Sequence, residues 1–216
     1  MKSGNSPFVA AIAAVGLAAA ATIGIGLHAA RAATIIDEWA SVKLPAPPEL
    51  KPVTVDPKTT ALLMLDFTSQ NCGKRPRCLA SIPAVQKLLG EARAAKATVI
   101  YSIIPTVAIA DIIKDVAPRP DEPWVQAGAD KFVGTDLAKM LKDKGIQTVI
   151  VSGTASNGAV LFTAADAAFR GMNVIVPVDG ISASDSFAEL GTVYDFKAAP
   201  SLAAKTTLTR TDMIKF

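Results

Sequence analysis

Two charged side chains stand where the fold could bring them together for proton transfer. Asp66 directly follows the apolar run 61–65, and Lys131 lies in a loop segment. In an open parallel sheet, functional groups gather past the carboxyl ends of the strands. A carboxylate beside an ammonium in a partly dry cleft can exchange protons while its charge stays compensated. Asp66, at such a strand end, and Lys131, in a loop that could join it, are therefore our candidates for one functional site.

The two cysteines, Cys72 and Cys78, are six residues apart, and two interpretations stay open. In an oxidising compartment, thiols this close are expected to form a disulfide. The chain-entropy model gives such a small ring about 2–2.5 kcal/mol of stabilisation. The alternative is that Cys72 is a reactive thiol facing the same cleft as Asp66.

Residues 1–32 predict a signal peptide rather than part of the fold. Lys2 precedes the apolar run 8–27, and Ala30-Arg31-Ala32 offers a small-x-small cleavage pattern. The run is also long enough to be an uncleaved membrane anchor, the one case in which a membrane would be a partner. Either way we expect the folded part outside the cytoplasm, periplasmic or secreted. Cleavage after Ala32 would remove the only histidine, His28, and with it Ser-His-Asp or Cys-His catalysis.

Without residues 1–32, the charge of the chain argues against nucleic acid as a partner, and its composition suggests a second copy of the chain. The 22 basic residues less Lys2 and Arg31 leave 20 against 19 acidic ones, with no basic stripe for nucleic acid. Residues 33–57 begin with a short helix predicted over 35–42 and continue as a proline-rich arm. The arm could lie on its own domain or clasp a second copy in a homo-oligomer.

Residues 58–216 alternate strand-like and helix-like patterns. Strands are predicted at 61–65, 98–103, 147–152, 173–178 and 206–209, with helices from Ser81 onward and at 109–116, 136–144, 157–170 and 185–197. This order predicts a three-layer α/β fold, an open and mostly parallel sheet with helices on both faces.

Three segments, taken in order, resemble the isochorismatase-like hydrolases, which include nicotinamidases and related cysteine amidases. They are Leu63-Met64-Leu65-Asp66-Phe67, then Asp130-Lys131-Phe132 with Thr135-Asp136-Leu137, and the turn Gly153-Thr154-Ala155-Ser156-Asn157-Gly158-Ala159 with the helix after it. The resemblance covers about residues 58–182. It implies that Asp66 is the acid–base carboxylate and Lys131 its ammonium partner. It also implies a cis peptide at Thr154–Ala155 and an anion pocket at the backbone of this turn.

The departure from the family pattern is Ala159, which occupies the position of the nucleophilic cysteine. Alanine has no nucleophilic atom, so acyl-enzyme chemistry is excluded at this residue. True isochorismatases resemble this pattern more closely, because they carry glycine there and cleave a vinyl ether by protonating carbon. The metal-binding region of nicotinamidase-like members, here 102–111, has no histidine and only Asp111, so we expect no metal and no cofactor.

We therefore predict hydrolysis of a small molecule by Asp66 and Lys131 without a covalent intermediate. One alternative is a catalytically silent relative that binds a small ligand, and another is a hydrolase that uses Cys72. The residues that could contact the ligand are Phe67, Trp124, Phe132, Thr154, Ala155 and Ser156. The three aromatic ones could equally be plain core. The substrate itself is not given by the sequence.

Overall fold

The computed structural model describes residues 33–216, which divide into two units, 33–45 and 46–216. The predicted signal peptide and its cleavage site lie outside the described residues. Within residues 33–216 no helix is both long enough and apolar enough to cross a bilayer. In the first unit, helix α1 spans Ile35–Glu38, half the predicted length. All of its residues are exposed, so no packing extends it beyond the turn capped by Thr34 and Asp37.

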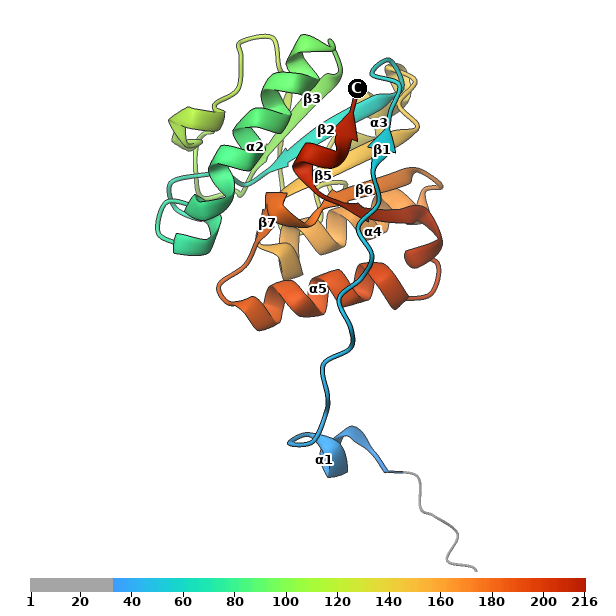
Figure 1. Ribbon diagram of the computed structural model, residues 1–216. Helices are drawn as coiled ribbons and strands as arrows, with labels where there is room; N and C mark the ends of the chain where they lie inside the picture. Colours follow the sequence, from blue (N-terminus) through green and yellow to red (C-terminus); the bar gives the residue numbers. More distant parts are fainter. Residues whose placement is uncertain (1–32) are drawn as a thin grey trace, which may run out of the picture. The chain divides into compact units, whose positions relative to one another are not determined.

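The second unit is built on a parallel sheet of strand order β4-β3-β2-β5-β6-β8 (Figure 1). The strands are β2 Thr60–Leu65, β3 Thr98–Ile103, β4 Trp124–Gln126, β5 Thr148–Thr154, β6 Asn173–Pro177 and β8 Thr206–Thr209. A short strand, β7 Ile181–Ser182, pairs with the last two residues of β5. All of these pairings are parallel, which confirms the predicted fold class.

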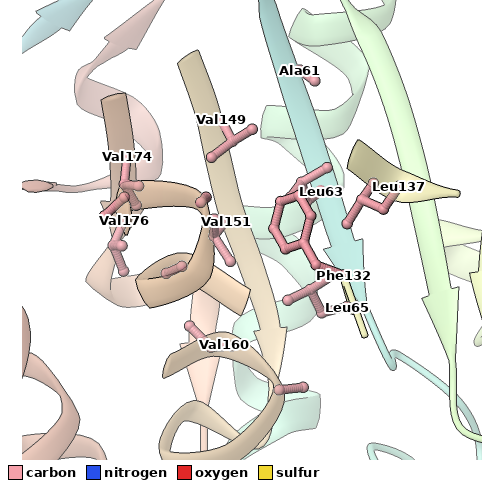
Figure 2. Close-up of a cluster of buried hydrophobic side chains, with 14 of the residues drawn as sticks. Ala61, Leu63, Leu65, Phe132, Leu137, Val149, Val151, Val160, Val174 and Val176 are labelled. Carbon is pink, nitrogen blue, oxygen red and sulfur yellow. The ribbon is translucent and has the colours of Figure 1, made fainter. Parts of the chain in front are cut away.

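Alternation along the central strands creates two hydrophobic cores, one on each face of the sheet. Leu63 and Leu65 of β2 point to the face covered by α3 Leu137–Asp143, α4 Leu161–Phe169 and α5 Ser186–Ala198. Figure 2 shows the Phe132 ring packed beside these two leucines. Leu62 and Met64 point to the opposite face, covered by α2 Pro76–Ala94. Figure 1 shows α2 in front of β2 and β3. Strands buried on both faces explain the continuous apolar runs in the sequence.

Helix α2 begins at Pro76, so the prediction that it starts with Ser81 as a cap was wrong. The Ser81 hydroxyl instead donates to the Cys78 carbonyl oxygen at 2.8 Å, a bond to the preceding turn within the helix. Pro83 therefore lies inside the helix rather than in its first turn. Proline after a capping residue is a reliable start signal only when no earlier residue nucleates the helix.

Two other segments that were predicted as α-helix adopt a different helix type over all or part of their length. The segment predicted as a helix over 109–116 forms two 3₁₀ turns, Ile109–Asp111 and Lys114–Val116. The helix predicted from Asn157 begins as a π-helical segment, Ser156–Val160, before α4. The remaining helices and strands match within a few residues.

Four short strands were not predicted because they carry too few residues for a period to be visible. Strand β1, Val53–Thr54, pairs with β9, Ile214–Lys215, and β4 and β7 have three and two residues. The pairing of β1 places the later part of the proline-rich arm on its own domain. The Lys51 amide also donates to the Leu208 carbonyl at 3.0 Å. The predicted boundary at residue 58 stays a prediction.

Candidate active site

Asp66 leaves the carboxyl end of β2 in a left-handed conformation, with φ of 56°. Its amide donates to the Ser102 carbonyl of β3 at 3.1 Å, which continues the sheet pairing by one residue. Aspartate tolerates this region better than most residues. The carboxylate then accepts two hydrogen bonds, one from the Ser102 hydroxyl at 2.8 Å and one from the Lys131 ammonium at 2.7 Å. The predicted pair is therefore in direct contact.

Lys131 is held by the loop that follows β4 and by two helices. Its backbone amide donates to the Thr163 hydroxyl of α4 at 3.2 Å. Its carbonyl accepts from the Thr135 hydroxyl, which also accepts from the amide of Leu137 at the start of α3. Thr135 thus tethers Lys131 to α3.

The Lys131 side chain is fully buried, and all three of its ammonium donors have acceptors. Besides Asp66, these are the carbonyl oxygens of Gly128 at 2.8 Å and of Ala127 at 3.3 Å. An ammonium has three N–H donors and no acceptor, so this set saturates it. The ion pair is therefore a closed and fully satisfied network, as a buried charge requires.

Burial raises the pKa of the Asp66 carboxyl above its ordinary value of 3.8. The Lys131 charge and the hydrogen bonds from Lys131 and Ser102 oppose this effect without cancelling it. Only 2% of the residue is exposed to solvent, so water cannot stabilise the ionised form. Asp66 consequently keeps its proton to a higher pH than an exposed aspartate, which suits a general acid.

The turn after β5 lies at the same edge of the sheet as Asp66. Leu65 pairs with Gly153, so Asp66 and Thr154 leave neighbouring strands at corresponding positions. Gly153 is required there: a Cβ atom would stand 2.3 Å from the Leu65 carbonyl oxygen, and its φ is 155°. The next peptide bond, Thr154–Ala155, is cis, as the resemblance implied.

Ala159 lies in the π-helical segment that follows the cis bond, and only 5% of it is exposed. Thr163, the residue that binds the Lys131 amide, is four residues further on, which is about one helical turn. The segment carrying Lys131 therefore packs against the first turns after the position predicted to have lost its nucleophile. Alanine contributes a methyl group to the core there.

Ser156 and Thr154 are both buried and hydrogen-bonded within this region. The Ser156 oxygen accepts from the Thr192 hydroxyl of α5 at 3.4 Å. The Thr154 oxygen accepts from the Arg75 guanidinium at 3.3 Å. Arg75 was missed by the sequence analysis. The sequence shows only a basic residue between the two cysteines. That this residue reaches Thr154 becomes visible only in the folded chain.

The three aromatic candidates occupy different environments. Phe67 is fully buried in the core on the α2 face. Phe132 is 5% exposed in the opposite core, where the Arg170 guanidinium lies 4.8 Å from its ring centre. Trp124 is 43% exposed on the edge strand β4. The first two are core side chains, and a contact of any of the three with ligand stays a prediction.

Cys72 and Cys78 are joined by a disulfide bond, and both residues are fully buried. Residues 33–216 contain no free cysteine. A sulfur atom in a disulfide has no thiolate to attack a substrate. The hypothesis of a hydrolase that uses Cys72 is therefore contradicted, and the bridge ties the loop before α2 to the first turn of that helix.

No group of three or more metal-ligating side chains occurs in the part of the chain that the structure describes. Asp111, the one acidic residue in the region where a metal site was considered, accepts from the Ala108 amide at 2.7 Å. Its carboxylate thus caps a 3₁₀ turn.

Comparison with known proteins agrees with this architecture. A family model described as the isochorismatase domain matches residues 60–198. The nicotinamidase of Acinetobacter baylyi is 30% identical over 125 residues, covering 56% of this chain and 58% of that protein. The chain thus spans less than two thirds of that relative's length.

Solved structures share the fold at lower identity. A cysteine hydrolase from Pseudomonas syringae pv. phaseolicola has a TM-score of 0.66 at 22% identity, covering 78% of this chain and 95% of that one. N-carbamoylsarcosine amidase from Thermoplasma acidophilum has a TM-score of 0.61 at 22% identity, covering 71% and 97%. At this identity they support the fold alone. Because the family model covers well over half of the chain and every strand of the central sheet except β8, this chain belongs to the isochorismatase family of hydrolases.

Proposed function

We propose that this protein hydrolyses a small molecule by acid–base catalysis through Asp66 and Lys131, without a covalent enzyme intermediate. The observation that carries the proposal is the 2.7 Å contact between the two side chains at the carboxyl end of β2. The raised pKa of Asp66 supports a role as proton donor. Lys131 holds positive charge beside the carboxylate that remains after the proton has left.

The reaction that fits a proton donor without a nucleophile is cleavage of a vinyl ether. Asp66 would give its proton to the alkene carbon, which leaves an oxygen-stabilised cation. Water then adds to the cation. In the resulting hemiketal the bond from carbon to the ether oxygen breaks, and the hydroxyl proton moves to that oxygen, so a ketone and an alcohol are released. The proton lost by the attacking water returns to the Asp66 carboxylate, so the catalyst ends as it began.

Ala159 supports this route over the amidase route. A cysteine hydrolase forms a bond between sulfur and a carbonyl carbon, and a methyl group cannot do so. The Acinetobacter relative is a nicotinamidase by name, and its amide chemistry carries over to this chain only if another nucleophile replaces the thiol. Ser156 has no histidine to activate it, since the one histidine, His28, lies within the predicted signal peptide.

A second candidate function is ligand binding without turnover, and one observation favours it. Asp66 is 2% exposed, and Lys131 has an acceptor for every donor, so the network as it stands needs no substrate to complete it. A relative that lost its nucleophile could keep this ion pair for its structure alone. Catalysis, by contrast, requires the surrounding loops to open and admit substrate.

The setting that we propose is outside the cytoplasm. The Cys72–Cys78 bridge supports it, because disulfides persist in oxidising compartments. The predicted signal peptide in residues 1–32 would bring the chain there. Assembly into a homo-oligomer through residues 33–45 is a further proposal, which sedimentation analysis of the mature chain would test.

The test is a screen of vinyl ethers, amides and hydrazides with the mature protein and its Asp66→Asn variant. Turnover should fall by about 10²–10⁴-fold in Asp66→Asn, the usual contribution of a positioned acid. Asp143→Asn, which alters an exposed carboxylate on α3, is the matched control and should keep full activity. Activity that survives in Asp66→Asn would reject the mechanism.

Two further variants keep the test decisive. Ser102→Ala retains the ion pair and should lower turnover about tenfold through loss of one charge-assisted hydrogen bond, even if Asp66→Asn folds poorly. Ala159→Cys should gain amidase activity if the geometry of a cysteine hydrolase was kept. Binding of panel members without any turnover would instead support the second candidate.

A further inference from the structure

Arg75 is partly buried, and its guanidinium has no anionic partner within residues 33–216. It lies inside the disulfide loop and is the residue that precedes α2. The one hydrogen bond that its guanidinium makes there is the 3.3 Å contact with Thr154, and it forms no salt bridge. The next arginine, Arg77, is by contrast paired in a bidentate manner with Glu189. A guanidinium has five N–H donors, so most of those on Arg75 remain available.

Ser182 supplies an independent sign of an absent ligand. Its hydroxyl is the one buried side-chain polar atom in the described part of the chain that has no hydrogen-bond partner. The residue is 1% exposed. A buried hydroxyl without a partner is costly, and native proteins rarely keep one unless something else satisfies it.

The register of the sheet places Ser182 and Arg75 on the same face. Ser182 pairs with Thr154, and residues paired across neighbouring strands project to the same side. Arg75 contacts Thr154 on that side, at the start of α2. Because the Thr154 oxygen accepts from Arg75, its own hydroxyl proton is free to donate. Three side chains with available donors thus lie on one face at the end of β5.

A groove opens beside the residues that follow Arg75 and precede Ser182 in the chain. A groove of about 460 Å³ adjoins this point and is lined by Pro76 and Ile181, the neighbours of Arg75 and Ser182. Glu189 also lines the groove and accepts from the Ala183 amide, but Arg77 already neutralises its charge. Asp179 lines the groove as well and accepts from the Thr211 amide and hydroxyl, both at 2.8 Å. Arg75, next to the groove, is the guanidinium without a carboxylate partner among the described residues.

We propose that Arg75, Thr154 and Ser182 form a binding site for the carboxylate group of a small organic acid. The planar guanidinium matches the two oxygens of a carboxylate, and the two hydroxyls supply further donors. The inference rests on the proposed function for its location, because Thr154 opens the turn assigned to substrate. The proposed site implies that the substrate bound at that turn is an anion. Arg75, which would select for the anion, is positioned by the Cys72–Cys78 loop.

Binding measured without turnover tests this site separately from catalysis. The probes are benzoate and pyruvate, each with its neutral carboxamide, and the readout is the NMR signal of the Arg75 side-chain N–H together with titration calorimetry. At about 10 mM, well above the Kd of an ordinary weak fragment, a carboxylate should shift the Arg75 signal and its carboxamide should not. Arg75→Gln should cut the preference for carboxylate over carboxamide by at least about tenfold.

Matched variants separate charge from fold. Lys74→Gln removes an exposed cation from the same disulfide loop and should leave the preference unchanged. Ser182→Ala should weaken carboxylate binding by roughly threefold to tenfold, the effect of one hydrogen bond. An unshifted Arg75 signal with both acids, or an undiminished preference in Arg75→Gln, overturns the site. Carboxylate binding that survives Asp66→Asn with turnover abolished supports it, because the two functions then fail separately.

Discussion

Two ion pairs, anchored by consecutive residues of β3, show how differently one strand can use its two faces. Ser102 points to the face covered by α3 and α4 and donates to Asp66, the partner of Lys131. Tyr101 points to the α2 face, where its hydroxyl accepts from Arg93, the partner of Glu122. Both networks include a hydroxyl from β3, a cation and a carboxylate.

The networks differ in hydration and in geometry. The Asp66 and Lys131 side chains are 3% and 0% exposed, whereas those of Glu122 and Arg93 are 9% and 17% exposed. Arg93 makes two parallel bonds to Glu122, at 2.7 and 2.8 Å, and a third to the Ala117 carbonyl. Lys131 makes a single bond to its carboxylate. The Arg93–Glu122 pair clamps a loop to the end of α2, while the Asp66–Lys131 pair holds two buried charges at the end of β2.

The largest expected effect is that of Lys131→Met. Asp66 would be left buried without a counter-charge, so the free energy of unfolding should fall by about 3–5 kcal/mol at pH 8. The double variant Asp66→Asn, Lys131→Met should recover most of this loss, because no buried charge remains. Urea denaturation of the three proteins measures both values. Equal stability of the single and the double variant would contradict the account of the pair.

Arg93→Met should cost less, about 1–3 kcal/mol, since water can reach the Glu122 carboxylate that it abandons. The Tyr101 hydroxyl keeps its bond to the Val116 carbonyl at 2.9 Å. Turnover of any substrate found in the screen should be unaffected. Denaturation and activity assays on the same preparation check this, and a loss of activity without loss of stability would contradict a purely structural role.

The smallest effect is a pH dependence that belongs to Asp66. Because burial raises its pKa in the folded state above 3.8, the folded protein binds this proton more tightly than the unfolded chain does. The contribution to stability is therefore complete below pH 3.8 and is lost as the pH rises through the folded-state value.

Comparison of wild type with the double variant isolates the contribution of Asp66 to the pH dependence of stability. The stability difference between wild type and Asp66→Asn, Lys131→Met should decline as the pH rises from 3.8, by at most about 1.4 kcal/mol per pH unit. The curve of Arg93→Met should run parallel to that of wild type. A difference that grows with pH would show that the Lys131 charge outweighs burial and lowers the pKa of Asp66.

Much of this arrangement follows from short-range patterns. The continuous apolar run ending at Asp66 indicated a buried parallel strand, and small residues after β5 indicated the turn. The contact of Asp66 with Lys131 was predicted from the place of Asp66 at a strand end, from a loop position for Lys131 that could join it, and from the family resemblance. The Cys72–Cys78 bridge was expected from spacing, although its rival interpretation was excluded only by the structure.

Other features depend on contacts between distant residues. Strand β4 has three residues, too few for a periodic signal, yet the loop after it supplies two carbonyl groups to Lys131. Arg75 reaches Thr154 across 79 positions of sequence. The Ser182 hydroxyl lacks a partner only because β7 pairs with the end of β5.

The sequence by itself determined the alternation of the five longer strands with helices, the family, and the alanine at position 159, because each of these is written in local residue types and their spacing. The tertiary structure decided which charges meet, how completely they are buried, and which donors remain unsatisfied. Hydration and hydrogen-bond saturation are properties of the space that packed elements enclose, and no local pattern encodes that space.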